Sequence, residues 1–217
     1  MISEHHIEIR KSARYFVLEP EKETVAILYA IHGYRQLGQY FTKQFQALAD
    51  LGVKVVAPEG LHRFYIEGYS GRVGASWMTK EDRLTDIKDY VGYLNQLHHQ
   101  LSPSFGNLPI HLLGFSQGGP TACRWLAGSE VDFASLMLYA TVFPNDFDFD
   151  ANQSRMKSIP TTIAFGDSDQ FAPEETIAEK MNWLSMKGMN ANLIRFRGGH
   201  EIFADVLCQW WQSIQND

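Results

Sequence analysis

The sequence predicts an α/β protein, built from a mostly parallel central sheet with helices on both faces. Short apolar runs recur along the chain and alternate with longer amphipathic segments. The apolar runs lack the period-two alternation of a strand with one solvated face, so both faces of each strand should be buried. The length of 217 residues suits one core. We therefore expect a single domain over residues 1–217, without a large cap domain.

Eight runs are candidate strands. They cover residues 7–10, 15–18, 25–31, 53–57, 109–113, 134–141, 161–165 and 191–196. The first two look like strands joined by a polar turn, and the later ones suit a buried parallel sheet.

Four segments are candidate helices. Between residues 82 and 101, leucine, isoleucine and valine recur at helical spacing, which predicts one apolar face. A second helix is expected over 121–127. A third should begin at Pro173, which is followed by two glutamates, and end near Gly188. The last is expected over 202–214. Residues 60–80 form the longest segment without a clear pattern, and loops of that length are usually functional.

Charge and composition exclude several classes of partner. The net charge is −6 and no cluster of lysine or arginine exceeds two residues, so neither nucleic acid nor an anionic membrane surface is expected as a partner. No stretch approaches the roughly 18 apolar residues of a membrane span, so no stable membrane insertion is expected. The N-terminal stretch does not resemble a signal peptide, which predicts a cytoplasmic protein. Cys123 and Cys208 are too few for a disulfide framework or a zinc site, and we expect them to be small buried side chains.

One short motif carries most of the functional information. Residues 114–119 read GFSQGG and follow an apolar run, with a helical stretch after them. This fits the pattern G-x-S-x-G, in which a serine occupies a tight turn between a strand and a helix. The glycines on either side leave room for the backbone to fold back. Ser116 is therefore a candidate nucleophile, and the N–H of Gln117 should face an anion formed beside it.

A serine hydroxyl needs a base and an orienting carboxylate, and the chain supplies both in the order Ser, Asp, His. Residues 161–165 are followed by Gly-Asp-Ser-Asp, and residues 191–196 are followed by Arg-Gly-Gly-His. The candidates are Asp167 or Asp169 and His200, each just past the carboxyl end of a strand, where open α/β sheets bind ligands. Gly33 follows an earlier strand and would let the backbone approach, so the N–H of Tyr34 is a candidate second oxyanion donor.

Other patterns point away from competing chemistry. The glycines around Ser116 do not fit a dinucleotide or phosphate-binding loop, and the sequence has no H-E-x-x-H motif. The aspartates at 146, 148 and 150 lack the spacing of a calcium loop, so a solvated loop is expected there. The remaining histidines considered, at positions 5, 6, 98 and 99, are expected to be solvated. No metal site is predicted.

The motifs together resemble the phospholipase and carboxylesterase branch of the α/β-hydrolase superfamily, which includes acyl-protein thioesterases. The matching stretches are HGY, GFSQGG, GDSDQFAP and GGHEI, and the resemblance spans roughly residues 25–210. It implies an α/β-hydrolase fold, with Ser116 as nucleophile, Asp169 as the acid and His200 as the base. The stretch after Trp77 departs from the family pattern, which bears on substrate choice.

The resemblance implies a serine hydrolase that cleaves carboxylic esters or acyl thioesters through an acyl-enzyme. The substrate would be a small molecule, and no cofactor would be required. Phe64, Tyr65, Tyr69 and Trp77 are candidates for the walls of an apolar pocket, because residues 60–80 are the only candidate lid. A catalytically silent binding protein on the same fold, or an acyltransferase or peptidase with the same triad, remain alternatives. The sequence leaves the oligomeric state open.

Overall fold

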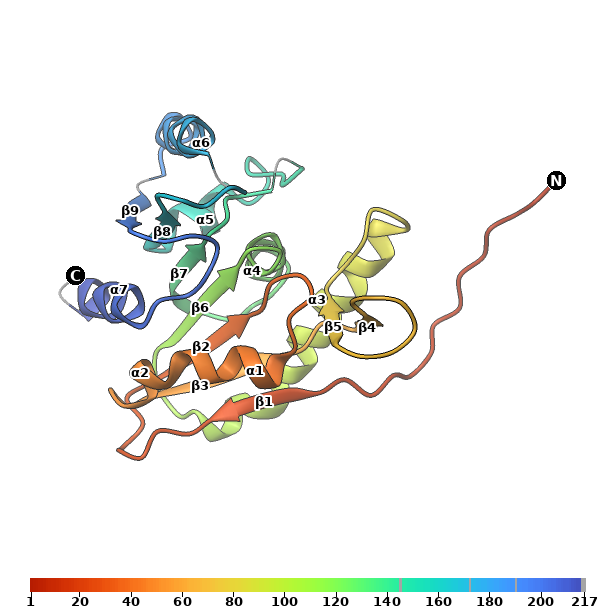
Figure 1. Ribbon diagram of the computed structural model, residues 1–217, viewed down its shortest axis with the longest axis horizontal. Helices are drawn as coiled ribbons and strands as arrows, with labels where there is room; N and C mark the ends of the chain where they lie inside the picture. The colour runs from red at the N-terminus through yellow and green to blue at the C-terminus, as the bar shows by residue number, and fades with distance from the viewer. Residues whose placement is uncertain (145, 172, 190, 216–217) are drawn as a thin grey trace.

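A computed structural model describes residues 1–144, 146–171, 173–189 and 191–215. Its centre is a seven-stranded sheet in the order β1-β3-β2-β6-β7-β8-β9 (Figure 1), in which only β1 is antiparallel to its neighbour. The strands are β1 (Tyr15–Leu18), β2 (Ala26–Ile31), β3 (Val53–Pro58), β6 (Ile110–Phe115), β7 (Phe133–Tyr139), β8 (Thr161–Gly166) and β9 (Ala191–Phe196). The predicted fold class, a mostly parallel sheet in an α/β protein, is confirmed.

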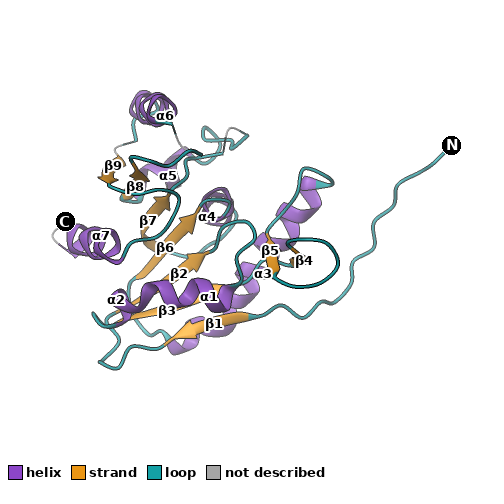
Figure 2. Ribbon diagram, viewed as in Figure 1, coloured by secondary structure: helices purple, strands orange, loops and turns teal. Residues whose placement is uncertain are grey.

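Helices cover both faces of the sheet (Figure 2). One face carries α1 (Gly38–Thr42), α2 (Gln46–Ala49) and α7 (Ala204–Gln215), and the other carries α3 (Arg83–Leu101), α4 (Gly118–Ala127), α5 (Gln153–Ser158) and α6 (Glu174–Met186). Strand β2 shows why the strands read as continuous apolar runs. Ile27 and Tyr29 enter one core and Ala26 and Leu28 enter the other, so successive side chains are all buried.

The predicted strand at residues 7–10 is wrong. Residues 1–14 form no regular element and run away from the sheet as an extended arm (Figure 1), in which Ile7 and Ile9 are 87% and 78% exposed. The arm instead follows polar partners. Lys11 Nζ donates to the carbonyl of Leu61, and Glu8 pairs with Lys88 on α3. None of the described strands pairs with residues 7–10, so the alternating isoleucines have no neighbouring strand.

Residues 60–80 are also more regular than predicted. They contain a two-stranded hairpin of β4 (His62–Tyr65) and β5 (Val73–Ser76). The hairpin is joined to the main body through the loop after β2, because Gln36 and Ala75 form an antiparallel bridge. Two short 3₁₀ turns, Lys43–Phe45 and Ser102–Ser104, complete the regular structure of the described residues.

The parallel strands bring the functional candidates to one edge. Strands β2, β6, β8 and β9 run in the same direction, so the loops that follow them all leave from the carboxyl edge of the sheet. These loops hold Gly33, Ser116, Asp169 and His200. In the part of the chain that the structure describes, no helix combines the length and apolar character that a bilayer crossing requires.

Candidate active site

Ser116 lies at the sharp turn between β6 and α4. Its φ angle is 52°, a left-handed conformation that is unusual for a residue with a side chain. The turn is fixed on both sides, because the N–H of Ser116 donates to the carbonyl of Tyr139 at 3.0 Å and the N–H of Gly119 donates to the carbonyl of Ser116 at 2.9 Å. A strained backbone held in this way is typical of functional residues.

Close backbone approach explains the glycines around Ser116. A Cβ atom added to Gly114 would lie 2.5 Å from the carbonyl oxygen of Gly118. A Cβ on Gly118 would overlap the carbonyl oxygen of Ile31, at the end of β2. The motif therefore allows two contacts at once: the strand folds back on the helix, and the helix start packs against the neighbouring strand.

The loop after β2 reaches the nucleophile directly. A Cβ on Gly33 would lie 3.1 Å from the Cβ of Ser116, so the backbone before Tyr34 passes beside the serine. Among the described residues, the backbone N–H groups of Tyr34 and Gln117 have no hydrogen-bond partner. One of these donors is next to Ser116 in sequence and the other is next to Gly33, which packs against it, and unpaired N–H groups of this kind are suited to binding a developing oxyanion.

The acid and base candidates meet at the ends of β8 and β9. His200 Nδ1 lies 2.8 Å from Asp169 Oδ2, and the other carboxylate oxygen, Oδ1, accepts the N–H of Phe171 at 2.9 Å. The Asp169 side chain is completely buried, whereas that of His200 is partly exposed. The His200 ring lies between two aromatic rings, with centroids 5.0 Å from Phe115 and 4.9 Å from Phe171. Because Phe115 precedes Ser116, the histidine packs against the nucleophile's own neighbour.

Asp167, the alternative acid, faces elsewhere. Its Oδ1 accepts the N–H of Gly198 and the hydroxyl of Ser168, both at 3.0 Å. These hydrogen bonds lower the pKa of the exposed Asp167 carboxyl, and the one from the Gly198 N–H has the largest effect. Asp167 thus ties the loop after β8 to the loop after β9 and leaves the contact with His200 to Asp169.

A buried histidine supports the loop after β2. His32 Nδ1 lies 2.7 Å from the carbonyl of Gly33, and Nε2 accepts the N–H of Gly60 at 2.9 Å. These partners require a neutral ring with the proton on Nδ1. Burial lowers the pKa of His32 to about 4, which agrees with that state. His32 is therefore a structural support of the loop that carries Tyr34.

Comparison with known proteins identifies the family. The family described as "Serine hydrolase (FSH1)" matches residues 22–204. The chain belongs to the FSH1 serine hydrolase family. A comparison with curated proteins found no match.

Solved structures similar to this FSH1 serine hydrolase include an acyl-protein thioesterase 2 from Zea mays, at 18% identity and a TM-score of 0.69, covering 94% of this chain and 99% of that chain. Esterase PE8 has 20% identity and a TM-score of 0.71, covering 94% and 100%. A carboxylesterase from Mesorhizobium loti has 16% identity and a TM-score of 0.69, covering 92% and 94%. At these identities the likeness establishes the α/β-hydrolase fold, as the resemblance in the sequence implied.

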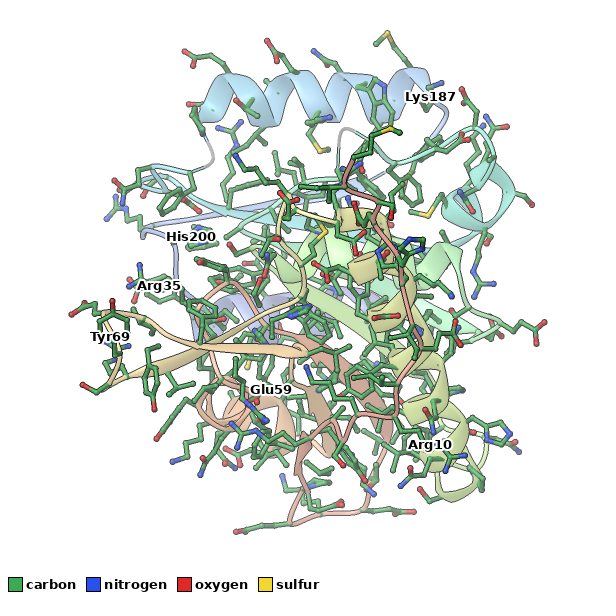
Figure 3. The ribbon with its side chains drawn as sticks, turned by 90° about the vertical axis from the view of Figure 1, so that its right-hand side faces the viewer. Arg10, Arg35, Glu59, Tyr69, Lys187 and His200 are labelled. Carbon is green, nitrogen blue, oxygen red and sulfur yellow. The ribbon has the colours of Figure 1, made fainter. Side chains whose placement is uncertain are left out.

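The four pocket candidates of the FSH1 serine hydrolase lie in different surroundings. The ring of Phe64 stacks on that of Tyr34 with centroids 5.3 Å apart, and Tyr65 is half exposed beside it. Tyr69 is 97% exposed at the outer end of the hairpin (Figure 3). Trp77 is 0% exposed and belongs to the core, so its ring offers no surface to a substrate. The chain turns inward there because the indole N–H donates to the carbonyl of His32.

The side chain of Gln117 has a role that the sequence did not indicate. Its Oε1 accepts the N–H of Trp77 at 3.2 Å, and its Nε2 donates to the carbonyl of Met78 at 2.9 Å. The residue after the nucleophile thus fastens the base of the hairpin to the elbow. The sequence shows that a glutamine follows the nucleophile in GFSQGG, but the motif alone does not show which segment its side chain contacts.

The polar residues set aside in the sequence do not join the site. Asp146 pairs with Arg124 and Arg83, and Asp150 pairs with Lys187, so part of the run expected to be solvated is ion-paired. Among the described residues, one trio could hold a metal ion: Glu4, His6 and Asp82, all exposed, with ligand atoms within 4.8 Å of one another. It lies on the N-terminal arm and at the residue before α3, and such exposed groups are common without a metal.

Proposed function

We propose that this FSH1 serine hydrolase cleaves carboxylic esters or acyl thioesters, with Ser116 as nucleophile, His200 as general base and Asp169 as the acid that orients it. The observation that carries the proposal is the 2.8 Å contact between His200 Nδ1 and a fully buried Asp169 carboxylate, with the His200 ring packed on Phe115, the residue before the serine of the strained elbow. The acyl-protein thioesterase and the carboxylesterase among the structural neighbours support this class of substrate.

The hydrogen bonds suggest how the proton moves. With Nδ1–H donated to Asp169, the lone pair of Nε2 is free to accept the Ser116 proton. Ser116 Oγ then bonds to the substrate carbonyl carbon, and the carbonyl oxygen becomes an oxyanion that the N–H groups of Tyr34 and Gln117 stabilise. Collapse of the intermediate breaks the bond to the leaving group, which takes the proton from His200. Water, activated by His200, releases the acid from the acyl-enzyme in the same two steps.

Phe64, Tyr65 and Tyr69 remain proposed as lining for the substrate, on the hairpin side of the site. Phe64 is the strongest of the three, because its stack on Tyr34 places an aromatic surface next to the proposed oxyanion donor. The proposed reaction uses no metal or organic cofactor, and the substrate is a small molecule. We also propose a cytoplasmic location, which cell fractionation against marker enzymes would test.

Labelling with a fluorophosphonate probe tests the nucleophile directly. Wild-type protein should be labelled. Ser116→Ala should lose the label and most of its turnover, and the remaining rate should be on the order of 10³–10⁴ times that of the uncatalysed reaction in water, as when a triad member is lost. The Ser116→Ala protein should keep its far-UV circular dichroism spectrum and melting temperature. Labelling that persists in Ser116→Ala would refute the assignment.

The same preparation separates the alternatives. A silent binding protein would give neither label nor turnover of any ester or thioester. An acyltransferase would be labelled but would release acyl groups mainly to an added alcohol or amine. A peptidase would also cleave peptide amides, which an esterase leaves intact. Hydrolysis of esters or thioesters in buffer, lost in Ser116→Ala, is the result expected.

A further inference from the structure

Arg35 is an unusual residue for its position in the loop after β2. Its φ angle is 67°, a left-handed conformation that glycine or asparagine ordinarily takes because a longer side chain is strained there. It lies two residues after Gly33, where an added Cβ would be 3.1 Å from the Cβ of Ser116. A strained arginine beside a candidate nucleophile suggests a functional role for its side chain.

The backbone of Arg35 is held firmly against the hairpin. Its N–H donates to the carbonyl of Ala75 at 2.9 Å, and the next residue, Gln36, forms a bridge with Ala75. On β5, Gly74 makes this approach possible, since a Cβ there would lie 2.6 Å from the carbonyl oxygen of Arg35. The start of the arginine side chain is therefore fixed relative to the elbow, so the guanidinium can serve a defined part of the site.

The guanidinium of Arg35 has no partner within the part of the chain that the structure describes. Several other arginines are paired: Arg14 with Glu59, Arg124 with Asp146, and Arg195 with Glu174. Figure 3 shows Arg35 on the same side of the molecule as His200, between that residue and Tyr69 on the hairpin. An exposed, unpaired cation thus lies on the side of the molecule that carries His200, in a chain whose net charge is −6.

We propose that the natural substrate is an ester or thioester that carries a carboxylate, and that Arg35 pairs with this group when the carbonyl is beside Ser116. The inference rests on the proposed function. A planar guanidinium matches a carboxylate with two parallel hydrogen bonds. One unpaired arginine against a negatively charged protein suits a singly charged group better than a phosphate dianion. Arg35 would then determine specificity, while the nucleophile, base and oxyanion donors are untouched.

Matched pairs of substrates test this proposal. For a carboxylate on the leaving group, 4-(butyryloxy)benzoate is compared with its neutral methyl ester. For a carboxylate on the acyl chain, 4-nitrophenyl hydrogen adipate is compared with 4-nitrophenyl hexanoate. The measured quantity is the ratio of kcat/KM for the anionic and neutral member of each pair, after subtraction of spontaneous hydrolysis. The pair that responds to Arg35 shows on which side of the scissile bond the carboxylate lies.

In Arg35→Gln, the ratio for one pair should fall about three- to tenfold, the range expected for a charge-assisted contact that remains partly solvated. Turnover of the neutral members should change little, and Arg35→Lys should keep part of the preference. Raising the salt from about 0.05 to about 0.5 M should reduce the wild-type ratio and leave that of Arg35→Gln nearly constant. Arg10→Gln is the matched control, because it removes the same charge from the N-terminal arm, far from His200 in Figure 3.

A variant that relieves the backbone strain separates specificity from folding. Arg35→Gly suits the left-handed conformation, so its melting temperature should stay within about 3 °C of wild type while the anionic preference is lost. Equal ratios in wild type, Arg35→Gln and Arg10→Gln for both pairs would overturn the inference. If wild type hydrolyses none of the esters, the proposed function fails instead. Hydrolysis without anionic preference refutes the role of Arg35 alone.

Discussion

Exchanging each of two nearby carboxylates for an amide tests the acid assignment. In Asp169→Asn the new side chain is buried and meets two groups, His200 Nδ1 and the N–H of Phe171. If the amide oxygen accepts the Phe171 N–H, the amide NH₂ faces Nδ1 and forces the histidine proton onto Nε2. The ring can then no longer accept the Ser116 proton.

The opposite orientation of the amide is disfavoured. It keeps the productive tautomer but places the NH₂ group against the Phe171 N–H, so that two buried donors face each other and neither has an acceptor. An unsatisfied buried donor costs about 1–3 kcal/mol, so the unproductive orientation dominates by about five- to more than 100-fold. The asparagine also lacks the charge that stabilises the imidazolium formed during catalysis, and with both effects a comparable substitution in a serine protease lowers turnover by about 10⁴. We expect a loss of that order in kcat for Asp169→Asn, with a similar melting temperature.

Asp167→Asn is the matched control. Its amide oxygen can still accept both the Gly198 N–H and the Ser168 hydroxyl, so kcat should stay within about tenfold of wild type and the melting temperature should fall slightly. Both variants are compared by kcat on one 4-nitrophenyl ester and by thermal unfolding followed with circular dichroism. A larger loss of turnover in Asp167→Asn than in Asp169→Asn, with both proteins folded, would refute the reasoning.

Two further substitutions test the fold around the site. Gly118→Ala forces a Cβ against the Ile31 carbonyl, so it should lower the free energy of unfolding by about 1–3 kcal/mol and the melting temperature by several degrees. The control Gly92→Ala, in open space on α3, should raise the melting temperature. An unchanged melting temperature in Gly118→Ala would contradict the packing. Burial lowers the pKa of His111 to about 4, whereas in the unfolded chain the histidine titrates near about 6.5. Between these two pH values the unfolded chain binds a proton that the folded protein does not, so stability falls as pH drops from about 6.5 to 4. The free energy of unfolding, measured with urea at several pH values, should fall less steeply in His111→Gln than in wild type, by up to about 1.4 kcal/mol per pH unit. Equal slopes for the two proteins would count against this role of His111.

Local sequence signals predicted the central sheet and the elbow well. Strand β2 is apolar and buried at every position, and the glycines around Ser116 mark a crossing of backbones that is visible in the motif itself. The choice of Asp169 over Asp167 came from the resemblance and from the place of Asp167 directly at the strand end, and it stays a prediction; of the two, Asp169 is the one that contacts His200. Both aspartates follow the same strand, so spacing alone does not distinguish a carboxylate that faces inward from one that caps a neighbouring loop.

The failures share a different cause, because they depend on contacts between distant segments. The alternating isoleucines at residues 7 and 9 suit a strand, but a strand needs a partner, and none of the described strands pairs with this segment. Trp77 looked like a pocket wall because it lies in an aromatic loop. Its burial is determined by the carbonyl of His32, 45 residues earlier in the chain. No pattern within either segment reports that contact.

The contacts of Trp77 also limit how residues 60–80 can move. The base of the hairpin is fastened to the elbow through Gln117 and to the loop after β2 through Ala75. A hinge at this base would break the contacts that support Tyr34 and Gln117, the proposed oxyanion donors, so it would disable the site that a lid should protect. The outer end differs: Gly68 and Gly71 have φ angles of 58° and 91°, and nothing lies within 4 Å of an added Cβ. Any closure over a substrate should therefore involve the turn between β4 and β5, with the base serving as part of the rigid frame that holds the nucleophile.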